Sequence, residues 1–295
     1  MGDDFEKLKK LNQLIYKDQA IWFLNAFWAE HGSDAEGVWN YTNKMIELDE
    51  KNGTGGNEID EFTAHRFLEQ TEDTMTVREL RETLREIDID TNKMVSLTEY
   101  LIFHYKIDWH KLVNAAQSDN TEEIDRAQAL LADALQKLGH ARGKADEARK
   151  LETIQRQAEA DAKKALALLK AEELAYENRR IDLERRTNEG GIVSRNKAKN
   201  ELQQLLGEDP LPLRRAKINQ GAAVRANERA TAVAGEARKV ADEALGVAVK
   251  AFEEAEAYLV EIRNMGGSGE GVLWWIDREI TEAKKYLPQS KGGGR

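Results

Sequence analysis

Within the stretch 121–189, apolar and small residues follow a seven-residue repeat over four heptads, and after a slip in register the pattern resumes with Leu151, Ile154, Ala158, Ala165 and Leu168. Large aliphatic residues and alanines alternate at intervals of three and four residues: Ile124, Ala127, Leu131, Ala134, Leu138, Ala141, Ala145 and Ala148. This spacing puts one apolar stripe on a helix, as in coiled coils. The stretch has no proline, so it predicts one helix roughly 100 Å long at about 1.5 Å per residue. Gly139 and Gly143 should weaken that helix by about 1 kcal/mol each relative to alanine.

A second repeat predicts another long helix over 213–265. Its seam consists of alanines, one tyrosine and three valines: Ala216, Ala223, Ala230, Ala237, Ala244, Ala251 and Tyr258, with Val233, Val240 and Val247. A shorter helix is expected over 192–207, between the glycines at 190–191 and a turn at 208–212. The simplest packing is an antiparallel hairpin of the two long helices with the short helix as third partner. A continuous parallel dimer is the alternative, which the two breaks disfavour.

The N-terminal third contains a twelve-residue stretch, 88–99, with the spacing of an EF-hand calcium loop. The flanking stretches 75–87 and 97–106 have helical patterns. The expected metal ligands are Asp88, Asp90, Asn92, the backbone carbonyl of Met94, a hydroxyl or water at Ser96, and Glu99 as a bidentate carboxylate. Because this pattern surrounds one hard cation with oxygen atoms, the predicted cofactor is calcium.

Loop position 6 departs from the EF-hand pattern, because Lys93 stands where glycine is usual. A lysine in a left-handed conformation costs about 1 kcal/mol and adds a positive charge near the site. The loop is therefore interpreted as a weak calcium site. A degenerate EF-hand kept as a packing unit is the alternative.

EF-hands occur in pairs, so a partner is expected upstream of this loop. A helix over 35–48 would enter it, and 59–70 would hold its apolar residue and the exit helix. Counting back from Ile59 as position 8 puts Asn52 at position 1 and Thr63 at position 12, and a threonine cannot supply a bidentate carboxylate. If Asp49 begins the loop, the loop contains an insertion. The first loop is predicted to be structural, with unconventional calcium binding as the alternative, and Val95 should form the short β-contact between the loops.

Composition narrows the class of protein. The chain has no cysteine, so disulfides and thiolate chemistry are excluded. No apolar run approaches the length of a membrane span, and the acidic, polar N-terminus does not have the pattern of a signal peptide. The five histidines show no metal-ligand spacing, and no nucleophile stands beside a plausible base. These observations predict a cytosolic protein that is not an enzyme, has no membrane span and has no nucleic-acid partner.

Charge is unevenly distributed along the chain. Residues 1–120 carry 24 acidic and 13 basic side chains, a net charge of −11, and residues 121–295 have a net charge of +1. Within 191–240, ten basic residues face five acidic ones, a net of +5. An acidic N-terminal part and a basic stretch in one chain predict an acidic partner, an internal contact between the two, or both.

Glycines at 266–271 predict a flexible linker before a C-terminal segment that contains Trp274 and Trp275. The two tryptophans are expected to pack back on the EF-hand part or the bundle, with a partner contact as the alternative. The expected domains are a calcium-binding domain at 1–118, a helical bundle at 119–265, and the linker with its C-terminal segment at 266–295.

Several motifs together resemble a known family. The sequence reads FLNAFWAE at 23–30, VSLTEYL at 95–101 and WWIDR at 274–278, followed by KKY at 284–286. In this order the chain resembles the calcium-regulated 34 kDa actin-bundling proteins of slime-mould amoebae, over nearly its whole length. The resemblance implies an EF-hand domain followed by a spectrin-like helical bundle, and cross-linking of F-actin that calcium inhibits.

The sequence therefore predicts an all-α protein that cross-links actin filaments under calcium control in the cytoplasm and cytoskeleton, as a monomer or weak dimer. Filament surfaces are acidic, so basic side chains are the candidates for actin binding: Arg214, Arg215, Lys217, Arg225 and Arg229 first, then Lys284 and Lys285. The alternative function is a calcium-sensing coiled-coil scaffold for a non-actin partner or a vesicle.

Overall fold

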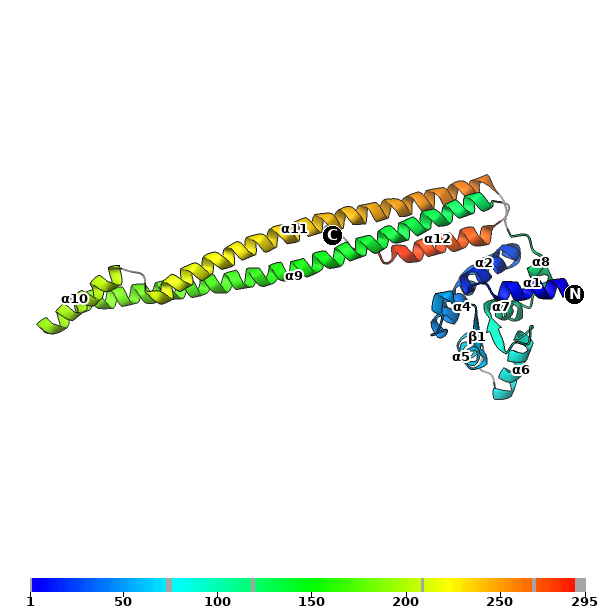
Figure 1. The fold of residues 1–295 in the computed structure, drawn as a ribbon, viewed down its shortest axis with the longest axis horizontal. Helices are drawn as coiled ribbons and strands as arrows, with labels where there is room; N and C mark the ends of the chain where they lie inside the picture. Colours follow the sequence, from blue (N-terminus) through cyan, green and yellow to red (C-terminus); the bar gives the residue numbers. More distant parts are fainter. Residues whose placement is uncertain (1, 73–75, 118–119, 208–209, 267–268, 290–295) are drawn as a thin grey trace. The chain divides into compact units, whose positions relative to one another are not determined.

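The computed structural model describes residues 2–72, 76–117, 120–207, 210–266 and 269–289 (Figure 1). The chain forms two compact units, each built from separate parts of the sequence. The first unit combines Met1–Leu135 with Val249–Tyr286, and the second combines Gln136–Ala248 with Leu287–Arg295. The two long helices pass from one unit into the other, so these units do not follow the boundaries expected at 118 and 265. The domain limits expected from the sequence stay a prediction.

The N-terminal part of the first unit holds two helix–loop–helix units and the helices around them. Its helices are α1 (Gly2–Asn12), α2 (Tyr16–Ala26), α3 (Trp28–His31), α4 (Ala35–Leu48), α5 (Glu61–Thr71), α6 (Val77–Ile87), α7 (Leu97–Tyr105) and α8 (Trp109–Asn114). Short 3₁₀ turns occur at η1 (Gly32–Asp34) and η2 (Gly53–Gly55). Position 75 of the expected helix 75–87 lies outside the described residues.

Two three-residue strands join the loops of the two helix–loop–helix units. Strand β1 (Glu58–Asp60) pairs antiparallel with β2 (Met94–Ser96), and Ile59 stands opposite Val95. Both residues are buried. The apolar positions that the sequence assigned to a contact between two loops therefore do meet in this way.

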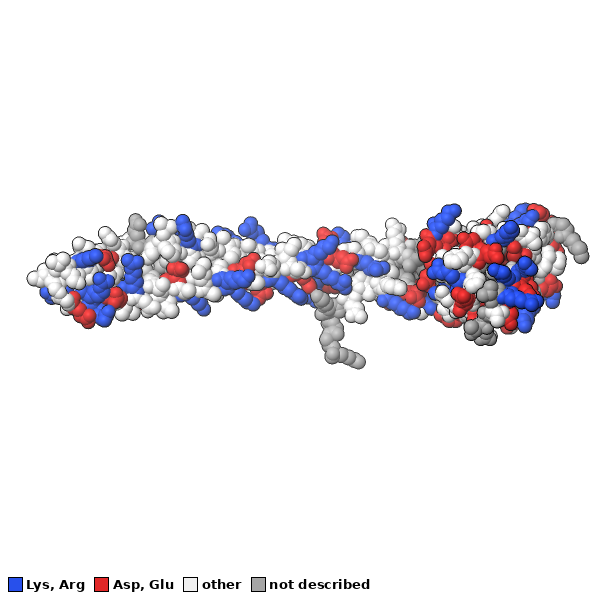
Figure 2. Space-filling model, turned by 90° about the horizontal axis from the view of Figure 1, so that it is seen from below, with Lys and Arg blue, Asp and Glu red and all other residues white. Residues whose placement is uncertain are grey.

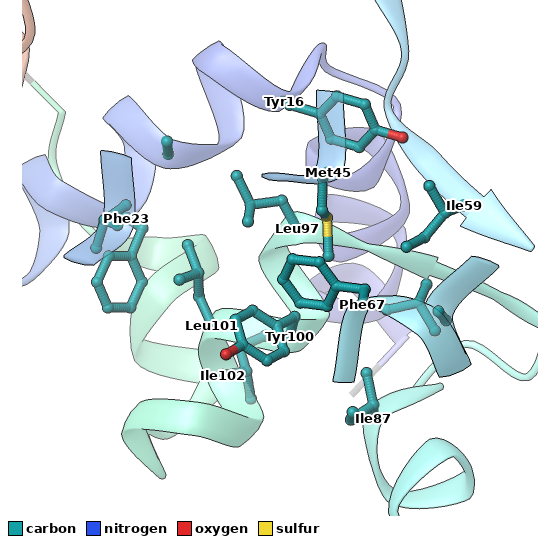
Figure 3. Packing of buried hydrophobic residues seen from close by; sticks show 14 of the residues in the cluster. Tyr16, Phe23, Met45, Ile59, Phe67, Ile87, Leu97, Tyr100, Leu101 and Ile102 are labelled. Carbon is teal, nitrogen blue, oxygen red and sulfur yellow. The ribbon is translucent and has the colours of Figure 1, made fainter. Parts of the chain in front are cut away.

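A buried apolar cluster holds these elements together (Figure 3). Phe67 of α5 and Tyr100 of α7 pack edge to face with ring centroids 4.7 Å apart. Tyr16 and Phe23 of α2 and Met45 of α4 are fully buried in the same cluster. Each such side chain contributes about 1.5–3 kcal/mol by leaving water, so this cluster is the main stabilising feature of the N-terminal elements.

Four helices form the remainder of the described chain: α9 (Thr121–Arg186), α10 (Ile192–Gly207), α11 (Leu211–Met265) and α12 (Glu270–Lys284). Helix α9 continues through Gly139 and Gly143 without a break. Positions 208–209 of the expected turn, 267–268 of the expected linker, and 290–295 lie outside the described residues. None of the described helices is long and apolar enough to cross a bilayer.

Helices α9 and α11 form a long antiparallel hairpin (Figure 1). Within the first unit the guanidinium of Arg126 lies 4.7 Å from the ring centroid of Tyr258. Within the second unit Ala148 and Ala241 line one small pocket, and Arg179 and Leu211 line another. Residue numbers rise along α9 as they fall along α11, so the expected antiparallel arrangement is confirmed.

The α9 seam is buried at the expected positions from Ile124 to Ala148, apart from the half-buried Ala145, but Ile154 and Leu168 of its expected continuation are 58% and 50% exposed. In α11 the expected alanine positions lie at the interface, whereas the expected valine positions do not. Val233, Val240 and Val247 are 51%, 36% and 52% exposed, so the prediction that they fill the interface was wrong. Ala216 and Ala251 of the expected seam are buried, and the other buried positions of α11 include Ala234, Ala248, Phe252, Ala255, Leu259 and Ile262. Near the end of α11 one phenylalanine, one leucine and one isoleucine bury more apolar area than three valines, and they set the rotation of the whole helix.

The third helix beside the hairpin also differs from the expectation. In the first unit α12 lies along the end of α11, where Lys284 pairs with Glu256 at 2.7 Å and Arg263 pairs with Asp277 at 3.2 Å. Helix α10, the expected third partner, lines a pocket with the end of α9 and the start of α11. Its sixteen residues bury only Ala198 and Leu205, which is too little apolar surface to line the whole hairpin.

Candidate functional site

Three carboxylates converge in the loop between α6 and α7. One oxygen atom from each of Asp88, Asp90 and Glu99 lies within 4.8 Å of the others. Like charges at this separation repel one another unless a cation or a proton is present. The cluster therefore has the composition of a metal site, and all three donors are the hard oxygen ligands that calcium and magnesium prefer.

The loop folds around Asp88 by hydrogen bonds from its own backbone. The backbone N–H of Asn92 donates to Asp88 Oδ1 at 3.0 Å, and that of Lys93 donates to Asp88 Oδ2 at 3.0 Å. These bonds require a tight turn, and Lys93 adopts it with φ of +65°. Lys93 therefore adopts the left-handed conformation that was expected at this position, although this conformation is less favourable for lysine than for glycine.

Glu99 is the most buried member of the cluster, at 1% exposure. Ser96 is the N-cap of α7, and its backbone N–H and hydroxyl both donate to Glu99 Oε2, at 3.1 and 2.9 Å. The backbone N–H of Ile89 donates to Oε1 at 3.1 Å. Burial, with a smaller contribution from the charge of Asp90, raises the pKa of the Glu99 carboxyl to about 7 despite these hydrogen bonds. A nearby cation would stabilise the ionised form of this buried carboxyl.

Asn92 and Met94, two further expected ligands, have different surroundings. Asn92 Oδ1 accepts from the backbone N–H of Met94 at 2.6 Å, and Asn92 Nδ2 donates to Glu58 at 3.1 Å. Met94 lies in β2, half-buried, opposite Asp60. The structure thus gathers the three acidic residues, while the amide of Asn92 links the loop to the strand of its neighbour.

No pattern in the sequence indicated Asn12, which also reaches this loop. Asn12 in α1 is buried, and its Nδ2 donates to Asp90 Oδ2 at 3.4 Å. Its Oδ1 has no hydrogen-bond partner among the described residues. Asn12 lies 78 residues before Asp90, so no local spacing would have indicated the contact.

The loop of the first helix–loop–helix unit is closed by its own side chains. Asp49 is buried, and its carboxylate accepts from the Tyr16 hydroxyl at 3.0 Å and from the backbone N–H of Asn52 at 3.0 Å. Gly56 fits against both Asp49 and Tyr16, since a Cβ at that position would lie within 3 Å of each side chain. Thr63 lies in the first turn of α5, where its N–H donates to Asp60. The loop's main acidic group is therefore already satisfied.

The candidate actin-binding residues of the first rank lie along α11 in the second unit. All five side chains, those of Arg214, Arg215, Lys217, Arg225 and Arg229, belong to exposed residues. Arg214 and Arg225 are eleven residues apart, about three turns, and Arg229 follows one turn later, so these three share one helix face. Figure 2 shows, on the face in view, basic side chains interspersed with acidic and uncharged ones.

The two candidate lysines near the C-terminus have ionic partners. Lys284 pairs with Glu256 of α11, and Lys285 pairs with Glu282 at 2.8 Å within its own helix. Both lysines belong to the first unit, whereas the five basic residues of α11 belong to the second.

The tryptophan pair of α12 packs against the N-terminal elements, as the main interpretation of the sequence expected. Trp275 is 2% exposed, and its ring centroid lies 4.8 Å from that of Trp39 in α4. Arg278 lies over the same Trp39 ring at 4.8 Å and pairs with Glu36 at 2.8 Å. Trp39 was not singled out in the sequence, and Arg278 appeared there only as the last residue of the WWIDR motif, because only the fold brings α4 and α12 together.

Comparisons with known proteins agree with this architecture. Residues 110–261 match the family model described as the F-actin bundling C-terminal region. The crystal structure of the 34 kDa F-actin bundling protein from Dictyostelium discoideum matches with a TM-score of 0.50 and 19% identity, over 99% of each chain. A search of curated proteins found no match. The chain therefore belongs to the family of 34 kDa F-actin-bundling proteins.

Proposed function

We propose that this protein cross-links actin filaments into bundles in the cytoskeleton, and that calcium bound by the loop 88–99 inhibits the cross-linking. The match of residues 110–261 to the F-actin bundling family supports the first part. The converging oxygens of Asp88, Asp90 and Glu99 support the second. Calcium, when bound, supplies the positive charge that this carboxylate cluster lacks.

The filament contact is assigned to the basic face of α11. Arg214, Arg225 and Arg229 lie on one exposed face, and Arg215 and Lys217 flank it. An acidic filament surface would be attracted to this face, and the attraction should weaken with added salt. Lys284 and Lys285 are the second candidates, and they pair with Glu256 and Glu282.

A continuous set of contacts in the first unit supports a route from the calcium loop to the hairpin. Thr98, next to Glu99, donates from its N–H and its hydroxyl to Gln19 Oε1 of α2, at 2.8 and 3.0 Å. Gln19 is 1% exposed, so this contact is held in a dry core. A shift of α7 at the loop would therefore be transmitted to α2.

Helix α2 carries the contact on to α12. Lys17 pairs with Glu279 at 2.7 Å, and Asn25 Oδ1 accepts from the backbone N–H of Val272 at 3.0 Å. Helix α12 in turn pairs with the end of α11 through Lys284. A reorientation of EF-hand helices on calcium binding is a known type of switch, and α12 is its proposed output here.

Low-speed co-sedimentation of full-length protein with actin filaments, against free calcium, tests the proposal. Wild type should bundle less as calcium rises. Glu99→Gln should lose most calcium uptake in isothermal titration and bundle equally at all calcium levels, because position 12 supplies two ligand oxygens. Glu86→Gln, an exposed carboxylate on α6, is the matched control and should behave as wild type. Unchanged calcium uptake by Glu99→Gln would contradict the loop assignment.

A charge-reversal series tests the filament contact separately. Changing Arg214, Arg215, Lys217, Arg225 and Arg229 to glutamate should weaken pelleting with filaments, and added salt should have the same effect on wild type. Reversal of five exposed basic residues of α9, namely Arg149, Arg156, Lys163, Lys164 and Lys170, alters net charge equally and should have a smaller effect. Equal losses of pelleting in both variants would mean that filaments bind through non-specific charge attraction. If wild type does not pellet with filaments, the scaffold function is favoured.

A further inference from the structure

A cavity of about 570 Å³ opens beside the loop 88–99 in the first unit. Helix α6, the loop and the start of α5 form its walls. Its volume is within the range of about 300–1,000 Å³ that is usual for ligand pockets. It is therefore large enough to admit several side chains of a partner and much larger than a single small ion requires.

Three cations line this cavity: Arg81 and Arg85 of α6, and Lys93 of the loop. All three are exposed residues, and none of the three side chains has a hydrogen bond or ion pair within the described parts of the chain. The surrounding residues 1–120 have a net charge of −11. Unpaired arginines and lysine gathered at one cavity in so acidic a region are available to bind carboxylates from outside.

The remaining wall is mixed in character. Leu84 and Val95 are buried at 6% and 4% exposure, and Met94 is half-buried beside them. Two acidic residues, Glu61 and Asp88, also line the cavity. An apolar floor beneath a cationic rim suits a peptide that has an apolar side chain between carboxylates, and it suits a bare phosphate less well.

Two residues with an unfavourable backbone conformation line the cavity. Thr91 and Lys93 have φ of +57° and +65°, and both line the cavity. Such conformations cost about 1 kcal/mol each for residues with a Cβ, and glycine would remove the cost. Strain retained at a surface cavity is a reason to look for a role of the side chain, and here that role is a third cation.

We propose that this cavity binds an acidic segment of a partner protein, with carboxylates on Arg81, Arg85 and Lys93 and one apolar side chain against Leu84 and Val95. The site is separate from the basic face of α11, but it shares Asp88 and Lys93 with the loop proposed to bind calcium, so it is tested without calcium. It gives the acidic N-terminal part of the chain an interaction surface of its own.

Fluorescence anisotropy of full-length protein in the presence of a calcium chelator tests the site. The probe is a labelled peptide of aspartates and glutamates around a single leucine. It should bind saturably, and Arg81→Ala with Arg85→Ala should weaken binding by about tenfold, since two exposed ion pairs are lost at up to about 1 kcal/mol each. Arg66→Ala with Arg78→Ala makes the same charge change away from the cavity lining and should leave the affinity within about twofold.

Lys93→Gly provides a second variant that should fold at least as well as wild type, because glycine favours the observed φ. It should weaken peptide binding by several fold. Wild-type affinity for the peptide in both this variant and the double arginine variant would overturn the proposal. So would equal binding of a peptide with asparagine and glutamine in place of the acids, or displacement of the probe by millimolar inorganic phosphate.

Discussion

At Gly271 helix α12 lies close against α2, and Gly271→Ala is a sharp test of this contact. A Cβ at position 271 would lie 2.6 Å from the backbone nitrogen of Asn25 and 2.6 Å from the carbonyl carbon of Leu24. Both are main-chain atoms of a helix in the buried cluster, so they cannot move aside as a flexible side chain would. The substitution must therefore displace α12.

The magnitude follows from two opposing effects. Alanine in place of glycine favours a helix by up to about 1 kcal/mol. Overpacking against fixed atoms costs about 1–3 kcal/mol. Leu273, Trp275 and Ile276 are buried and hold α12 in place with about 1.5–3 kcal/mol each, so the helix should shift without detaching. The net expectation is a loss of about 1–2 kcal/mol.

Gly246→Ala is the matched control in the same protein. Position 246 lies inside α11, and a Cβ there would have no other atom within 4 Å. This variant should gain about 0.5–1 kcal/mol from helix propensity alone. Urea unfolding followed by circular dichroism, with tryptophan fluorescence reporting on Trp275 beside Trp39, compares the two. If Gly271→Ala proves as stable as Gly246→Ala, the close approach of α12 to α2 is refuted.

Three further predictions concern the loop 88–99 and its contact with α2. Lys93→Gly should bind calcium more tightly by titration than Lys93→Ala, because both remove the charge but only glycine relieves the positive φ. Without calcium, the free energy of unfolding should fall as pH rises from about 5 to 8. The pKa of Glu99 is raised in the folded state, so the folded protein keeps this proton at pH values where the unfolded chain has lost it. Glu99→Gln should abolish this slope. Gln19→Leu should destabilise the protein by about 2–4 kcal/mol in urea unfolding, because Thr98 and the carbonyls of Leu14 and Asn57 lose buried partners, whereas exposed Gln13→Leu should change little.

The sequence predicted those elements whose signals are local. The short helix 192–207 and the helix 35–48 begin and end in the structure where the pattern placed them. Gly190, Gly191 and Pro210 flank the helix 192–207 and act on the adjacent backbone, so the ends of this helix can be predicted without knowing the fold. The left-handed Lys93 and the pairing of Ile59 with Val95 follow equally from fixed positions within a loop pattern.

The predictions that were wrong concern how separate helices pack against one another. Val233, Val240 and Val247 satisfy the heptad spacing, yet α11 is rotated so that Phe252, Leu259 and other large residues are buried. The identity of the third helix was likewise decided by distant contacts. Helix α12 buries Val272, Leu273, Trp275, Ile276 and Ile280, whereas α10 buries only two side chains. Spacing shows which residues lie on one face of a helix, but the apolar area available elsewhere decides which face is covered.

The construction of the first unit from both ends of the chain determines how regulation can be tested. Removing residues 1–120 would take away α2 and α4, against which Trp275 and Arg278 pack, and would expose the apolar side of α12. A fragment that begins at 121 would therefore lose the calcium loop and also expose a new apolar surface. Increased pelleting of this fragment with filaments could come from either change. Point variants within the full chain avoid this problem. Glu36→Gln leaves the loop and the core in place and removes one ionic contact of Arg278, which is worth at most about 1 kcal/mol. If α12 transmits the calcium signal, this variant should alter the calcium dependence of bundling without altering calcium uptake, whereas a response identical to wild type in both assays would exclude the contact from the route.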